Sequence, residues 1–275
     1  MQLPQNLQAL DLETLQKLDY ETDVFLFKQP QGGEDYTPRY KKDPETFETF
    51  IKKIVTFKNK INGIFTTQAD RIPYLVNLFI VKADDSADFS TLFIDQEWET
   101  QEKETGSLLF DALYPIFYLG MTAEQTEWNY TSSFNVETAK PTTLVSDYSS
   151  KLGKNLTKST KNVILRHVKA SIRLGENRET LTARLTKVLK NEARARMIAQ
   201  TESVRMFGKG RFEVALEIGL SSKEWETGTG ACPICAELKG QVIPISDQFY
   251  SSMLALHLPG EPAHPHCKCS VRYKK

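Results

Sequence analysis

The sequence lacks long apolar runs and shows no sign of export. No uninterrupted apolar stretch approaches the roughly 18 residues that a membrane-spanning helix needs. The first residues, MQLPQNLQALDLETLQ, are polar and acidic, which is not the pattern of a signal or transit peptide. We therefore expect a protein that contacts no membrane and folds in a reducing cytoplasm, where clustered cysteines bind metal more often than they form disulfides.

Common catalytic motifs are also missing from the sequence. There is no Walker A loop, no HExxH and no GxSxG, which argues against the usual nucleotide-binding and hydrolase classes. A zinc deaminase needs His-x-Glu before a Pro-Cys-x-x-Cys segment. Here Pro233 lies inside the cysteine pair, and none of the four histidines is followed two residues later by glutamate.

Cysteine is scarce, and its distribution is informative. All four cysteines lie between residues 232 and 269, as CPIC and CKC, together with three of the four histidines. Two close cysteine pairs separated by a loop can present four thiolates to one tetrahedral zinc. We predict a structural zinc site of Cys232, Cys235, Cys267 and Cys269, with His264 as an alternative ligand. Reduced cysteines without metal and a reactive or redox-active pair are the other interpretations.

The net charge of zero conceals two halves of opposite sign. Residues 1–150 carry 13 Lys and Arg against 24 Asp and Glu, whereas residues 151–275 carry 22 against 11. The excess of positive charge is densest in 151–211, with 16 basic and 4 acidic residues. A basic half is able to bind a polyanion, or the two halves neutralise one another within or between subunits.

The apolar periodicity predicts a mainly α fold with a small α+β C-terminal subdomain resembling a zinc knuckle. A short helix is expected near residues 7–18, and longer ones from Pro44 onward, over 89–120 ending at Gly120, from 151 to Gly175, after Asn177, and from 191 to Gly219. Residues 72–81 fit either helix or strand. Three strand-like segments, KEWE, QVIPI and CSVRY, follow Gly219. The predicted organisation is an N-terminal arm (1–45), an acidic helical domain (46–145), a basic helical segment (146–219) and a cysteine-rich end domain (220–275).

The C-terminal part of the sequence, over roughly residues 155–273, resembles the phage head morphogenesis family, the minor head proteins of tailed phages and Mu-like prophages. Four ordered segments carry the resemblance: RARMIAQTES at 194–203, the pair Cys232 and Cys235, LKGQV at 238–242, and PAHPHCKC at 262–269. Lys239 replaces a usual acidic residue, His266 a usual Asn, and Lys268 a usual Arg.

This resemblance implies a minor structural protein of the virion, located in the capsid interior or at the portal vertex. The implied partners are the portal and the major capsid or scaffold proteins. Double-stranded DNA is a further possible partner, because phosphate contacts by Lys and Arg give binding without sequence preference. The residues predicted to make these contacts are Lys154, Lys158, Lys161, Arg166, Lys169 and Arg173.

An enzyme is the alternative hypothesis, either a metal-dependent nuclease or a transferase of the toxin type. Glu202 would be its catalytic carboxylate, with Thr201 and Arg196 beside it. The simpler interpretation is that Glu202 forms a structural ion pair with Arg205, three residues further along the same helix. We expect no catalysis.

Overall fold

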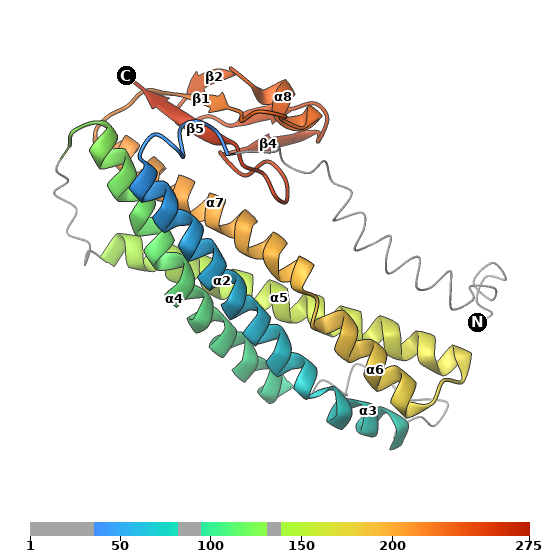
Figure 1. Ribbon diagram of the computed structural model, residues 1–275. Coiled ribbons are helices and arrows are strands. Elements are labelled where there is room, and N and C mark those ends of the chain that lie inside the picture. The colour runs from blue at the N-terminus through green and yellow to red at the C-terminus, as the bar shows by residue number, and fades with distance from the viewer. Residues whose placement is uncertain (1–35, 82–94, 131–138) are drawn as a thin grey trace.

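The structure, a computed structural model, describes residues 36–81, 95–130 and 139–275. Long helices form an elongated body, and a small domain containing the strands covers one end of it (Figure 1). The predicted mainly α fold with a small α+β C-terminal subdomain is confirmed. The predicted helix at residues 7–18 and most of the predicted N-terminal arm lie outside the described residues.

The body is built from long helices, some of whose ends the sequence predicts, although the helix predicted from residue 151 begins at Ala139. They are α2 (Pro44–Asp70), α3 (Ile72–Val81), α4 (Asp95–Glu127), α5 (Ala139–Leu174), α6 (Arg178–Leu189) and α7 (Glu192–Glu217). Asp43, Asn177 and Asn191 cap the N-termini of α2, α6 and α7 by accepting hydrogen bonds from backbone N–H groups. Gly219 follows α7 with a φ of +73°, a conformation that glycine adopts without strain.

Gly120 does not end a helix, contrary to the prediction for residues 89–120. It lies inside α4, which continues to Glu127, because here the chain needs a glycine for close helix packing. A Cβ at Gly120 would lie 2.1 Å from the carbonyl oxygen of Phe207 on α7, and one at Gly210 would lie 2.0 Å from that of Phe117 on α4. The two glycines therefore allow the backbones of α4 and α7 to touch.

Helix α5 crosses the predicted domain boundary at residues 145/146 without a break. The helices on either side of that boundary share one core, which takes residues from α2, α4, α5 and α7, including Phe57, Leu113, Leu156 and Val204. The acidic and basic parts of the sequence thus form one helical body. A second core lies at the end of the body remote from the strands, where α3 and α6 pack around Trp98 and the C-terminal half of α5.

The end domain contains five short strands and one short helix. The elements are β1 (Ser222–Glu226), α8 (Pro233–Leu238), β2 (Val242–Pro244), β3 (Phe249–Ser251), β4 (Leu256–Leu258) and β5 (Ser270–Lys274). Three of the strands form an antiparallel sheet in the order β2-β1-β5, in which Trp225 lies opposite Val271. These three are the strands expected from the sequence, whereas α8 and the hairpin β3–β4 were not predicted.

Residues 36–43 connect the end domain to the body. The backbone N–H of Thr37 donates to the carbonyl of Lys268 at 3.2 Å, and its hydroxyl lies 2.7 Å from that of Ser270. Arg39 binds Glu127 on α4 at 2.6 Å and Glu226 on β1 at 2.9 Å. The described end of the predicted arm is therefore packed against the C-terminal strand.

Candidate metal centre

Helix α8 presents the first cysteine pair. Cys232 is its N-cap residue and Pro233 occupies the first helical position, where the missing N–H of proline costs nothing. The backbone N–H of Ala236 donates to the carbonyl of Cys232 at 2.8 Å, which closes the first turn. Cys232 and Cys235 thus lie three residues apart on one turn, with both thiols buried.

A tight turn presents the second set of donors. The N–H of Cys267 donates to the carbonyl of His264 at 3.2 Å, so residues 264–267 form a β-turn. Pro265 occupies the second position of this turn, and His266 the third with a φ of +60°. That pattern is typical of a type II turn, whose third residue favours Gly or Asn. His264 and Cys267 therefore repeat the three-residue separation of Cys232 and Cys235.

The two turns bring five donors together. His264 Nε2 lies 3.0 Å from the sulfur of Cys232 and 3.1 Å from that of Cys235, while the Cys235 and Cys267 sulfurs are 3.7 Å apart. Cys235, Cys267 and Cys269 form a second group of ligand atoms that all lie within 4.8 Å of one another. A tetrahedral zinc with Zn–S bonds near 2.3 Å separates its sulfurs by about 3.8 Å. The donor chemistry and the Cys235–Cys267 distance both fit that ion.

The orientation of His264 indicates which of its nitrogens can bind a metal. His264 Nδ1 lies 2.7 Å from the carbonyl oxygen of Pro265, which only accepts hydrogen bonds. Nδ1 must therefore carry the proton, and in a neutral ring the lone pair is on Nε2, the atom that faces the thiols of Cys232 and Cys235. A backbone carbonyl that orients a histidine in this way is a common feature of zinc sites.

The thiols influence one another's protonation. Hydrogen bonding from Cys235 lowers the pKa of Cys232 and the pKa of Cys267, and His264 lowers both further. The pKa of Cys235 is raised, because its proton is shared with these two neighbours. Hydrogen bonding from Cys235 lowers the pKa of Cys269, but that pKa is also raised overall, mainly by the hydrogen bond with Cys267 and by burial. The cluster thus stabilises the thiolate form, which binds metals, at Cys232 and Cys267.

Helix α7 braces the turn that carries His264 and Cys267. The backbone N–H of His266 donates to the Thr201 hydroxyl at 3.1 Å, and the Gln200 side-chain amide donates to the His266 carbonyl at 3.2 Å. Thr201 in turn donates to the carbonyl of Met197 at 2.7 Å. Two segments that carry the family resemblance, around Thr201 and around His264, therefore meet in space.

The three residues of the alternative enzyme hypothesis have separate roles. Arg196 is exposed, and Thr201 is engaged with the metal-binding turn. Glu202 forms an ion pair with Arg205 at 3.0 Å and accepts a hydrogen bond from the hydroxyl of Tyr148. These contacts support the simpler interpretation of Glu202 as a packing ion pair.

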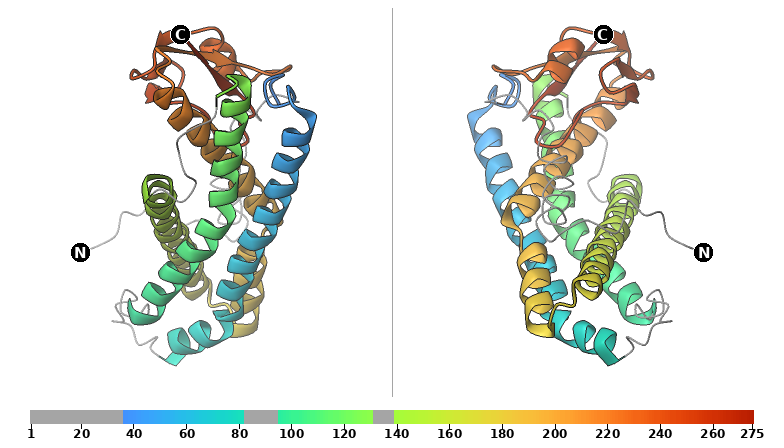
Figure 2. Two further views of the ribbon diagram at one scale, coloured as in Figure 1. Left: turned by 90° about the vertical axis from the view of Figure 1, so that its left-hand side faces the viewer. Right: turned by 90° about the vertical axis from the view of Figure 1, so that its right-hand side faces the viewer.

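The residues predicted to bind DNA all lie on α5, which runs along the outside of the body beside α4 (Figure 2). At 100° per residue the six side chains span an arc of about 140°, over about 28 Å of helix. The opposite side of α5 carries buried residues, including Leu156, Val163 and Ile164. Five of the six cations are exposed, and Lys161 is half-buried with its ammonium group 5.2 Å from the centre of the Trp98 ring. We call these six residues the basic face.

These features define a class of protein: a helical body with a small end domain held by a Cys/His cluster. Residues 162–272, less than half of the chain, match the family described as phage Mu protein F like protein. The match begins within α5 and includes all five candidate metal ligands. Over this segment the chain resembles a phage head morphogenesis family, as its sequence motifs suggested. No curated protein and no solved structure matches the chain significantly.

Among the described residues, no helix combines the length and apolar character needed to cross a lipid bilayer.

Proposed function

We propose that the protein is a minor structural component of a phage head, located at the portal or on the inner capsid surface, which acts by binding rather than by catalysis. The observation that carries this proposal is the match of residues 162–272 to the phage Mu protein F like family. The simplest test is mass spectrometry of purified particles. Detection at a fixed low copy number per particle supports the role, and absence from mature particles and from assembly intermediates contradicts it.

The proposed cofactor is a zinc ion with a structural role in the end domain. Cys232, Cys235 and Cys267 would supply three ligands, and the fourth would come from Cys269, as the sequence spacing predicted, or from His264. The proton on His264 Nδ1 and the short distances from Nε2 to two thiols favour His264. Four protein ligands complete a tetrahedral site, so the ion would stabilise the fold and leave no position for a reactive water.

The zinc content and the absorption spectrum of the cobalt-substituted protein test this assignment. We expect one zinc per chain, lost in Cys267→Ser and in His264→Ala but retained in Cys269→Ser. The cobalt spectrum should be that of three sulfurs and one nitrogen. Retention in His264→Ala with loss in Cys269→Ser would support four cysteines instead. A chain without zinc, whose Tm does not change in Cys232→Ser, would contradict the structural metal altogether.

Packaged DNA is the proposed ligand of the basic face. Its exposed cations lie on one side of α5 and cover a length of about eight base pairs. Neutralising phosphates releases counterions, so affinity should fall steeply with salt. This contact positions the protein on DNA of any sequence.

Salt titrations of binding to a duplex of arbitrary sequence test the DNA contact. The triple variant Lys154→Ala, Lys158→Ala, Lys169→Ala should lower the slope of log K against log salt by about 3. The matched control removes three lysines from α2, at Lys52, Lys53 and Lys60, and should leave the slope unchanged. Equal effects of the two triples would show that only net charge matters.

A further inference from the structure

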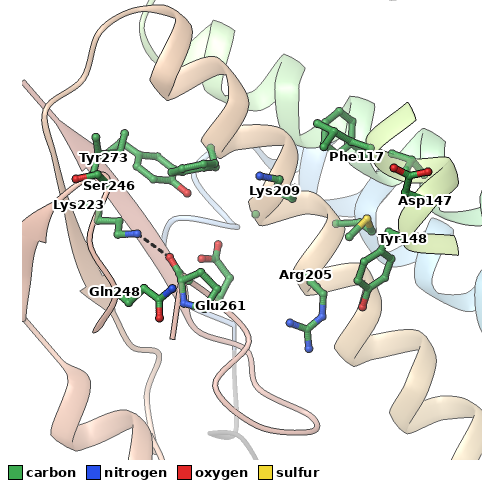
Figure 3. Close-up of a pocket in the computed structure, with 18 of the residues that line it drawn as sticks. Phe117, Asp147, Tyr148, Arg205, Lys209, Lys223, Ser246, Gln248, Glu261 and Tyr273 are labelled. Atoms are coloured by element: carbon green, nitrogen blue, oxygen red, sulfur yellow. Dashed lines mark hydrogen bonds between the residues drawn. The ribbon is translucent and has the colours of Figure 1, made fainter. Parts of the chain in front are cut away.

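A cleft of about 470 Å³ lies between the helical body and the end domain. Its walls come from α5 and α7 on one side and from β1, β5 and the chain around residues 245–248 and 259–261 on the other (Figure 3). None of the five candidate metal ligands and none of the six residues of the basic face lines it. The functions proposed above therefore leave this cleft unexplained.

The walls of the cleft are mainly apolar and rich in rings. Phe117, Val145, Met206, Phe212 and Tyr273 line it. A pocket of this size and composition accommodates an aromatic side chain, which buries a large area at a small cost in conformational entropy.

Glu261 is a buried carboxyl group in this wall, and one of its oxygens has no hydrogen-bond partner. The residue is 6% exposed, and its Oε1 makes no hydrogen bond within the described residues. A Cβ at Gly208 would lie 2.6 Å from that oxygen, so the carboxyl group lies against the backbone of α7. Figure 3 shows it directed into the space between the sheet and α7. A buried acceptor without a donor is costly, and a ligand that supplies a donor removes that cost.

Four cations line the cleft: Lys151, which is exposed, and Arg205, Lys209 and Lys223, which have partners within the chain. The ammonium of Lys209 binds Glu213 at 2.8 Å, and that of Lys223 donates to the carbonyl of Pro259 at 2.7 Å. Arg205 is paired with Glu202, as described above. Asp147 and Asp247 also line the cleft, so it carries both signs of charge. A charged ligand of either sign would meet like charges, and the environment favours a neutral one.

Two of these cations favour an aromatic ligand over an aliphatic one. The ammonium of Lys209 lies 4.7 Å from the centre of the Phe212 ring, and that of Lys223 lies 5.6 Å from the same ring. Cations in such positions attract the faces of aromatic rings, including that of an inserted ring, and have no comparable attraction for an alkyl group.

We propose that this cleft is a docking site for a tyrosine or tryptophan side chain of a protein partner, whose hydroxyl or indole N–H donates to Glu261. Tyrosine and tryptophan combine an aromatic ring with a neutral donor at its tip, and they are frequent anchors of protein interfaces. The proposal rests on the proposed role in the phage head only for the identity of the partner protein that supplies the side chain. The tests below use small amides, so they can fail independently of that role.

Titrations of the ¹⁵N-labelled full chain with N-acetyl amides, followed by NMR, test the chemistry of the cleft. N-acetyltyrosinamide and N-acetyltryptophanamide should shift the amide resonances of Gly208 and Gly260 with millimolar Kd values. N-acetylphenylalaninamide should bind about tenfold more weakly, because it lacks the donor. Equal affinity for the tyrosine and phenylalanine amides would overturn the role of Glu261. Shifts produced by a short oligonucleotide but not by the aromatic amides would overturn the proposal in favour of a nucleic-acid ligand.

Two variants test whether the amides bind in this cleft. Glu261→Leu should abolish the preference for the tyrosine amide over the phenylalanine amide. Gly260→Leu keeps Glu261 and fills the cleft; a Cβ at Gly260 comes no closer than 4.0 Å to Val271, so the chain tolerates it. It should weaken binding of both amides at least tenfold. The matched control Gly63→Leu, on α2 with no atom within 4 Å of its Cβ, should bind as the wild type does. Unchanged binding in Gly260→Leu would overturn the proposed location.

Discussion

Arg211 on α7 and Glu124 on α4 form a buried ion pair beneath the end domain. The Nε and Nη2 atoms of Arg211 both lie 2.7 Å from Glu124 Oε2, and the two side chains are 2% and 0% exposed. Glu124 Oε1 accepts a hydrogen bond from the indole of Trp128 at 2.9 Å, and the guanidinium of Arg211 lies 5.6 Å from the centre of the Tyr273 ring on β5. The pair therefore connects two helices of the body with the last strand of the end domain.

Glu124→Gln should lower the free energy of unfolding by about 3 kcal/mol, because it removes the nearest carboxylate and leaves the buried charge of Arg211 with only the more distant Glu127, at 3.9 Å, and Glu261. Urea denaturation followed by circular dichroism measures this. The control is Glu48→Gln on α2, whose partner Lys52 is also exposed and whose loss should leave the midpoint unchanged. Equal effects of the two variants would show that burial of the Arg211 pair is energetically unimportant.

Gly210→Ala should prevent stable packing of α4 on α7, since the added methyl group would lie 2.0 Å from the Phe117 carbonyl oxygen. We expect a loss of several kcal/mol or failure to fold. Gly63→Ala is the matched control, because its Cβ would meet open space on a helix. It should stabilise the protein by about 0.5–1 kcal/mol. Thermal unfolding of both variants is the measurement, and a Gly210→Ala protein with wild-type Tm would contradict the close crossing.

Thr201→Val should weaken zinc binding without removing a ligand. It removes the acceptor of the His266 N–H, and the turn that carries His264 and Cys267 loses a fixed position on α7. Loss of such a supporting hydrogen bond typically lowers metal affinity by about 10- to 100-fold. Competition with a chromophoric zinc chelator measures the change. Thr56→Val, which removes a hydroxyl bonded only within α2, should leave zinc affinity unchanged.

Glu261 should make stability depend on pH near neutrality. Burial raises its pKa from 4.5 to about 7, although the charge of Arg211 opposes this. Cys267, Lys223, Tyr40 and Tyr273 are further titratable groups that interact with it. Because the folded pKa exceeds the unfolded one, its contribution to stability is complete below pH 4.5 and is lost as the pH rises through 7.

The variant Glu261→Gln isolates this effect, because glutamine stays neutral throughout. Between pH 4.5 and pH 8, the unfolding free energy of the wild type should fall by about 3 kcal/mol relative to that of Glu261→Gln. Urea denaturation at several pH values measures it. Parallel pH profiles of the two proteins would contradict a raised pKa.

Local signals predicted much of the fold. Asp43, Asn177, Asn191 and Gly219 mark helix ends through hydrogen bonds and dihedral angles within a few residues, so the sequence is sufficient to locate them. Gly120 misled the prediction because a glycine that ends a helix and one that allows helix contact are the same in sequence. Only the position of α7 against α4 distinguishes them.

In the cysteine cluster, too, the sequence predicted the local features and only the structure showed the contacts between distant segments. CPIC and CKC predicted a metal site from spacing alone, since short turns aim neighbouring thiols at one point. The inclusion of His264 depends on its turn and on the carbonyl of Pro265, and the role of Thr201 depends on contact between segments more than 60 residues apart. Glu261 gave no sequence signal, because its burial and its unpaired oxygen arise only where the end domain meets α7.

The sequence by itself determined most of the long helices, the three strands of the sheet, the basic face of α5 and the four clustered cysteines. These depend on periodicity, capping and spacing, which act over short stretches of chain. The tertiary structure decided that acidic and basic segments form one body, that a fifth donor joins the cysteines, and that a cleft separates body from end domain. Those features depend on distances between segments far apart in sequence, which packing alone sets.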